Sequence, residues 1–210
     1  MGYYVQPFAV DIDKIRQVMG SNDLSLLKKI KSSDLYETYE SQSEDCDFDK
    51  IIKELIVNKP NQTDRNETTK FFGLFKSKPT FGLNPKYAPE YGYALLVICD
   101  TFGFFLPDCA EVLYTGDIWK EANKFFKSKR INIDLDRMWQ TENLFEIPEI
   151  GDFPVISHYS KNEIDYLLLE LKKIELEKFE NEELNEFITT FRDGLQFCKD
   201  KNLEWISFLH

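Results

Sequence analysis

Residues 160–198, SKNEIDYLLLELKKIELEKFENEELNEFITTFRDGLQFC, decide the fold class that we expect for this chain. Ser160 and Glu163 form a capping box, and Asn181 can cap a second helix twenty-one residues later. Each cap precedes an apolar stripe at helical spacing: Ile164, Leu167, Leu168, Leu171 and Ile174, then Leu184, Phe187, Ile188, Phe191, Leu195 and Cys198. Two long amphipathic helices joined by a short turn predict an antiparallel helix hairpin.

The two ends of the chain add strands to this hairpin. Residues 3–10 are rich in strand formers, and residues 203–210 have the same character. We expect them to pair in a small sheet that also takes in residues 153–157. Pro7 favours an edge position for the first strand, because proline donates no ladder hydrogen bond.

Between these ends the pattern is mostly helical. Asp11 and Asp47 can cap short helices, Leu24 to Ile30 indicate another, Pro89 can open a buried helix, and Asp117 starts one more. Residues 57–88 break the helical pattern. The prediction is therefore an α+β fold: one mostly helical domain over residues 1–210, with a C-terminal antiparallel helix hairpin, a small sheet from the terminal strands and a long irregular connection at 57–88.

Composition limits the function classes. The 210 residues carry 26 cationic and 37 acidic side chains, a net charge of -11, which disfavours binding to nucleic acid or an anionic membrane. The sequence predicts neither a secretory signal nor a membrane span, since the longest apolar run covers only residues 93–99. We expect a cytoplasmic protein with reduced cysteines.

Four short segments resemble an uncharacterised bacterial protein family. They are YYVQPFAVD at residues 3–11, YGYAL at 91–95, DFPV at 152–155 and ISFLH at 206–210. The resemblance spans nearly the whole chain and implies a single domain. It implies no activity, cofactor or catalytic residue.

Catalytic and metal-binding patterns are missing from the sequence. His158 and His210 are the two histidines, and Ser157 lies next to His158 on an expected strand, so their side chains point to opposite faces. Cys99 and Cys109 lie in apolar sequence typical of packing residues. No spaced Cys and His set, calcium loop or glycine-rich phosphate motif occurs. We therefore assign no catalytic residue, cofactor or metal.

The acidic run at residues 34–49 holds seven carboxylates and no Lys or Arg. One interpretation is a binding surface for a basic protein, formed by Glu37, Glu40, Glu44 and Asp45 with contact area from Tyr36 and Tyr39. The other interpretation is a solvated loop that keeps the protein soluble. A phenylalanine-rich loop at 70–83 is either an exposed patch or a flap docked on the core.

Three functional hypotheses remain. The leading one is a non-enzymatic acidic interaction protein, such as an immunity or antitoxin-like inhibitor of a basic partner protein. The second is an enzyme of unknown class that acts on a small anionic substrate near the 70–88 loop and His158, with Lys70, Lys76 and Lys78 facing it. The third is a structural or regulatory subunit. The sequence leaves the oligomeric state open.

Overall fold

A computed structural model describes residues 4–42, 46–58, 82–113, 117–174 and 181–210. At its centre lies a four-stranded sheet in the order β2-β1-β4-β3, in which every neighbouring pair is antiparallel. The strands are β1 (Val5–Val10), β2 (Phe104–Phe105), β3 (Val155–Tyr159) and β4 (Glu204–Leu209). The α+β class and the pairing of the two terminal strands are therefore confirmed.

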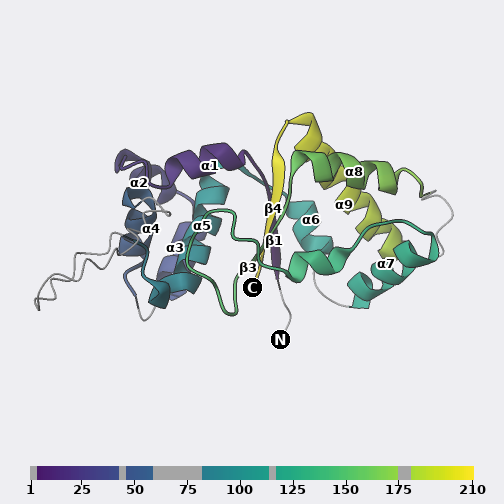
Figure 1. Ribbon diagram of the computed structural model, residues 1–210, viewed down its shortest axis with the longest axis horizontal. Helices are drawn as coiled ribbons and strands as arrows, with labels where there is room; N and C mark the ends of the chain where they lie inside the picture. The colour runs from purple at the N-terminus through teal and green to yellow at the C-terminus, as the bar shows by residue number, and fades with distance from the viewer. Residues whose placement is uncertain (1–3, 43–45, 59–81, 114–116, 175–180) are drawn as a thin grey trace, which may run out of the picture.

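Helices cover both faces of this sheet (Figure 1). One side carries α1 (Ile12–Val18), α2 (Ser25–Ile30), α3 (Asp34–Gln42), α4 (Phe48–Val57), the 3-10 turn η1 (Pro85–Tyr87) and α5 (Ala88–Phe102). The other side carries α6 (Pro107–Val112), α7 (Asp117–Ser128), the 3-10 turn η2 (Leu135–Trp139), α8 (Lys161–Leu171) and α9 (Glu182–Asp200).

The strands divide their side chains between two hydrophobic cores. Phe8, Val10, Ile156, Ile206 and Phe208 join the buried residues of α1 to α5, which we name the α5-side core. Val5, Ala9, Tyr159, Trp205 and Leu209 join α6 to α9, which we name the α9-side core. All six residues of β1 are buried, as expected for a strand that helices cover on both faces. Each fully buried large apolar side chain contributes about 1.5–3 kcal/mol.

The expected helix starts are confirmed where a side chain caps the helix. Asp11 accepts a hydrogen bond from the Lys14 amide, Asp47 accepts one from the Lys50 amide, and Asn181 accepts one from the Leu184 amide. Ser160 and Glu163 form the predicted capping box of α8. The hairpin of α8 and α9 is antiparallel, since Lys199 near the end of α9 pairs with Asp165 in the first half of α8 at 2.6 Å.

The edge position expected for β1 is wrong, because β1 lies between β2 and β4. The amide and carbonyl of Tyr4 both bond His210, so even-numbered residues of β1 direct their backbone groups at β4. Pro7 therefore faces the β2 side, where its carbonyl accepts from the Leu106 amide at 3.0 Å. Because Pro7 faces β2, its missing N–H costs β1 no bond to β4. Pairing with β2 is confined to Phe8 and Ala9.

The acidic run is not a loop over its first nine residues. Asp34–Gln42 forms α3, and Asp47 caps α4. Helix α4 ends at Val57, and η1 with the first residue of α5 falls within the irregular connection expected at 57–88. Residues 59–81, which hold most of that connection and of the phenylalanine-rich loop, lie outside the described residues. Within the part of the chain that the structure describes, no helix has the length and apolar character that crossing a membrane requires.

Candidate functional site

Helix α3 is held in place by the two tyrosines that the sequence analysis assigned to a binding surface. Tyr36 is 4% exposed and Tyr39 is 6% exposed, and both rings pack near Phe48 of α4. Their spacing of three residues puts both rings on the inner face of the helix. The tyrosines therefore anchor α3 and contribute little exposed contact area.

The hydroxyl groups of these tyrosines reach polar partners on α3, α4 and the sheet. Tyr36 donates to Glu40 at 2.9 Å and also contacts Asp49, which Lys31 pairs with from the other side. Tyr39 donates to Gln6 of β1 at 3.1 Å and stacks on Tyr93 of α5. Helix α3 is therefore tied to α4, α5 and the sheet.

These contacts change the ionisation of the groups involved. Burial raises the pKa of Tyr36, and its hydrogen bonds to Asp49 and Glu40 raise it further. Burial alone would raise the pKa of Asp49, but hydrogen bonds from Lys31 and Tyr36 outweigh it and lower that pKa. Asp49 is consequently tied to α3 through Tyr36 and is not a free surface charge.

Helix α3 carries the exposed carboxylates Asp34, Glu37 and Glu40, of which Glu40 also accepts the hydrogen bond from Tyr36. The exposed carboxylate of Asp47 follows at the start of α4. Glu44 and Asp45, which the sequence analysis also assigned to the surface, lie outside the described residues. Of the six expected surface residues, the structure thus exposes Glu37 and Glu40 and buries the two tyrosine rings.

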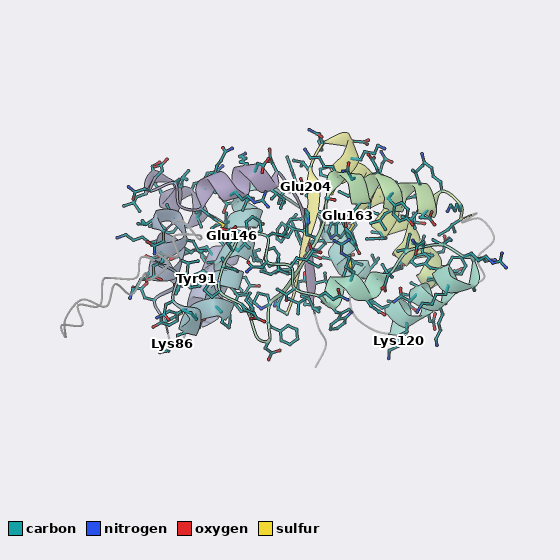
Figure 2. The ribbon with its side chains drawn as sticks, viewed as in Figure 1. Lys86, Tyr91, Lys120, Glu146, Glu163 and Glu204 are labelled. Carbon is teal, nitrogen blue, oxygen red and sulfur yellow. The ribbon has the colours of Figure 1, made fainter. Side chains whose placement is uncertain are left out.

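A second polar group surrounds His158, which is 8% exposed on β3. Its Nε2 lies 2.6 Å from Glu204 Oε2 on the neighbouring strand β4, and its Nδ1 lies 3.8 Å from Glu142 Oε2. The amide of Glu142 donates to the Ile156 carbonyl at 2.7 Å, which holds the segment before β3 against its free edge. Figure 2 shows Glu163 and Glu204 close to the central strands.

Arg137 of η2 extends this group. Its guanidinium donates to Glu142 Oε1 from Nε at 3.1 Å and from Nη2 at 2.8 Å, and its Nη1 contacts Glu163. Burial alone would lower the pKa of Arg137, but hydrogen bonds to Glu163 and Glu142 raise it. Burial alone would raise the pKa of Glu163, but hydrogen bonds from Arg137 and Ser160 lower it to about 2. The Arg137 guanidinium therefore joins two carboxylates into one ionised network.

A half-open cavity of about 270 Å³ lies beside this network, between the segment 141–150 and β3. Its apolar lining consists of Ile147, Pro148, Ile150 and Ile156, and its polar lining consists of Thr141, Glu142, Asn143 and Glu149. Among these described lining residues none is a lysine or arginine. The cavity therefore combines apolar walls with two acidic side chains.

The arrangement gives His158 no nucleophile within the described residues. Ser157 points to the opposite face, as expected from strand geometry, and its hydroxyl lies 2.7 Å from that of Ser207. Burial raises the pKa of Cys99, and it raises the pKa of Cys109 and of Cys198 to about 12, so these thiols stay protonated at neutral pH. No group of three or more His, Cys, Asp or Glu side chains suited to a metal occurs in the described ranges.

His158 was a candidate from the sequence, but its neighbours Arg137, Glu142 and Glu204 were not. Glu204 lies 46 residues from His158 in the sequence, and only the pairing of β3 with β4 brings the two together. A short-range signal existed for Glu163 alone, through the capping box.

Comparison with known proteins places the chain in a family. Residues 80–210 match the family described as a domain of unknown function (DUF7691), and the chain belongs to it. The resemblance to an uncharacterised family is thus confirmed for these residues, whereas the segment at 3–11 lies outside the match. No curated protein and no solved structure matches the chain.

Proposed function

Since this chain belongs to a family whose function is unknown, we propose from its own geometry that it is a non-enzymatic acidic interaction protein. In this proposal it binds a basic partner protein, as an immunity or antitoxin-like inhibitor does. The mechanism is steric occlusion of a cationic site on the partner, with charge-steered association.

The observation that carries the proposal is the fixed acidic helix α3. Its exposed carboxylates lie on a regular helix whose two tyrosines are buried, so the charges are held in position before any partner arrives. A binding surface on a rigid element loses less conformational entropy on association than one on a loop. The run at 34–49 contains no Lys or Arg, and the nearby Lys31 is paired with Asp49 of α4.

The charge of the described residues beside His158 also bears on the main alternative, whose expected cations Lys70, Lys76 and Lys78 lie outside the described residues. An enzyme acting on a small anionic substrate beside His158 needs cations around its pocket. The cavity next to Glu142 instead has two carboxylates and no lysine or arginine among its described lining residues. That lining repels an anion, which favours a cationic partner.

Charge steering makes a kinetic test possible. Fields from exposed carboxylates accelerate association by about 10-fold to 1000-fold at low salt, and they are screened beyond about 10 Å at 0.1 M salt. Neutralising Glu37, Glu40, Glu44 and Asp45 together, to Gln or Asn, is therefore expected to slow association by about tenfold or more at low ionic strength. The dissociation rate is expected to change less.

The partner is first captured from native cells on the immobilised wild-type chain and identified. Its association rate is then measured by stopped flow at low and high salt. The control variant neutralises Glu111, Glu183, Glu186 and Asp193, which are exposed on α6 and α9 on the opposite side of the sheet. It changes the net charge by the same amount, so a slower rate in the α3 variant alone supports the proposal. An unchanged rate at low salt contradicts it.

A further inference from the structure

We propose that the cavity between residues 141–150 and β3 binds a guanidinium group on an aliphatic stem, as an arginine side chain presents. In this proposal the cavity makes a second contact with the basic partner, separate from the contact made by helix α3. The proposal rests on the proposed function only for the source of that group, which we take to be the basic partner protein.

The polar wall of the cavity offers hydrogen-bond acceptors. Asn143 uses its Nδ2 to donate to the Ile147 carbonyl at 3.2 Å, which leaves its Oδ1 as an acceptor. Glu142 receives Arg137 at Oε1, whereas its Oε2 lies 3.8 Å from His158, beyond hydrogen-bond distance. Glu149 forms no hydrogen bond or ion pair with the residues that the structure describes. A ligand rich in donors matches this wall.

The charge balance of the cavity also favours a cation. Arg137 is shared between Glu142 and Glu163, so one cation faces two carboxylates before Glu149 is counted. The lining therefore keeps negative charge that a cation can neutralise. A divalent metal is a poor match, because the described residues contain no group of three acidic, His or Cys side chains arranged to hold one.

The size and shape of the cavity also match such a group. Its volume of about 270 Å³ lies just below the range of small-molecule pockets, about 300–1,000 Å³, and fits one long side chain. Ile147, Ile150 and Ile156 are each buried and provide an apolar wall for an aliphatic stem. A guanidinium is planar, carries five donors and is weakly hydrated, so it suits spread acceptors between apolar walls better than a compact ammonium does.

The test uses N-acetyl-L-argininamide as the probe and N-acetyl-L-citrullinamide, its uncharged analogue, as the control ligand. Binding is followed by NMR chemical-shift changes and titration calorimetry on the full chain at low salt. Saturable binding of the arginine probe, with shifts centred on residues 141–150 and Ile156, is the expected result. Equal binding of both ligands, or no saturable binding of the arginine probe, overturns the proposal.

A matched pair of variants locates the site. Glu149→Gln removes a charge from the cavity lining. It is expected to weaken the affinity for the probe by about tenfold, which corresponds to the loss of one charge-assisted contact. Glu146, which Figure 2 labels, is an exposed residue of the same segment and does not line the cavity. Glu146→Gln removes the same charge and is expected to leave binding unchanged. Equal effects of the two variants overturn the assignment.

Two further arms separate the source of the group and the two proposals. Tighter binding of the capped arginine than of free L-arginine assigns the site to a protein side chain, and the reverse order assigns it to a free small molecule. The probe contains no partner, so the variant neutralised at Glu37, Glu40, Glu44 and Asp45 is expected to bind it as the wild type does. An unchanged association rate in that variant, with saturable probe binding intact, thus contradicts the proposed function alone. Slowed association in that variant, with no saturable probe binding by the wild type, contradicts the cavity assignment alone.

Discussion

The ring of Tyr39 stacks on the ring of Tyr93, with centroids 4.9 Å apart and planes inclined by 27°. Tyr39 belongs to the acidic helix α3, and Tyr93 belongs to α5 within the region that matches the family. Burial raises the pKa of both phenols, and nearby Asp152 and Glu90 raise that of Tyr93 further. This aromatic pair is a direct link between the acidic helix α3 and α5.

Removing the Tyr39 ring is therefore expected to release α3. The Tyr39→Ala variant loses the contacts with Tyr93 and Phe48 and the hydrogen bond to Gln6, which predicts a loss of about 3–5 kcal/mol in the free energy of unfolding. Hydrogen exchange at the α3 amides is expected to accelerate more than exchange in α9. Thr38→Ala, at an exposed position of the same helix, is the control and is expected to change stability by less than about 0.5 kcal/mol.

The parts of this fold that depend on neighbouring residues were predictable. A capping side chain and its target amide lie three residues apart, so Asp11, Asp47, Ser160 and Asn181 marked their helices in the sequence. The apolar spacing of 164–174 and 184–198 likewise showed the inward faces of α8 and α9. These signals also carried the prediction of the α+β class.

The parts that depend on distant residues were not predictable. Helix α3 has a weak apolar stripe of Leu35, Tyr36 and Tyr39, and the same tyrosines are typical of binding surfaces. Only α4 and α5 decide which role they take. The central place of β1 also could not be inferred, because Pro7 favours an edge until the direction of its backbone groups is known. Likewise, sheet register alone brings Glu204 to His158.

The ionised network around Arg137 predicts a pH dependence of stability. The pKa of Glu163 falls from an ordinary 4.5 to about 2 in the folded chain, so its contribution is present above pH 4.5 and is lost as pH falls towards 2. Its side chain is 37% exposed, so solvent screening limits the expected loss in Glu163→Gln to about 1–2 kcal/mol at pH 7. Glutamine keeps the capping acceptor, so the variant tests the charge.

Urea unfolding between pH 7 and pH 3 measures this effect. The difference between wild type and Glu163→Gln is expected to shrink steadily below pH 4.5. Glu186→Gln, at an exposed position on α9, serves as the control and is expected to show a small difference at every pH. A difference that stays constant from pH 7 to pH 3 would show that the charge of Glu163 does not stabilise the fold.

Thiol labelling tests the packing of the cysteines. Cys99, Cys109 and Cys198 are 0%, 3% and 0% exposed, and burial raises the pKa of each, so their thiolate fraction at pH 8 is very small. Cys46 is half-buried at the start of the α4 region. We expect one fast-reacting thiol in the native protein and four in denaturant, followed with a chromogenic disulfide reagent. A Cys46→Ser variant that keeps the fast phase would contradict this assignment.

The segment that forms the cavity packs directly on α5, and Gly92 makes this possible. A Cβ atom at Gly92 would lie 2.8 Å from Ile150 Cδ1 and 2.8 Å from Pro154 Cγ, closer than real Cβ contacts. Gly92→Ala gains up to about 1 kcal/mol of helix propensity but overpacks this contact by about 1–3 kcal/mol, so a net destabilisation of about 1–2 kcal/mol is expected. Thermal unfolding measures it, with Gly151→Ala as the control, because a Cβ there meets no atom within 4 Å. A Gly92→Ala variant as stable as the wild type would show that the segment does not rest on Gly92. Since Ile150 lines the cavity, Gly92→Ala is also expected to weaken binding of N-acetyl-L-argininamide.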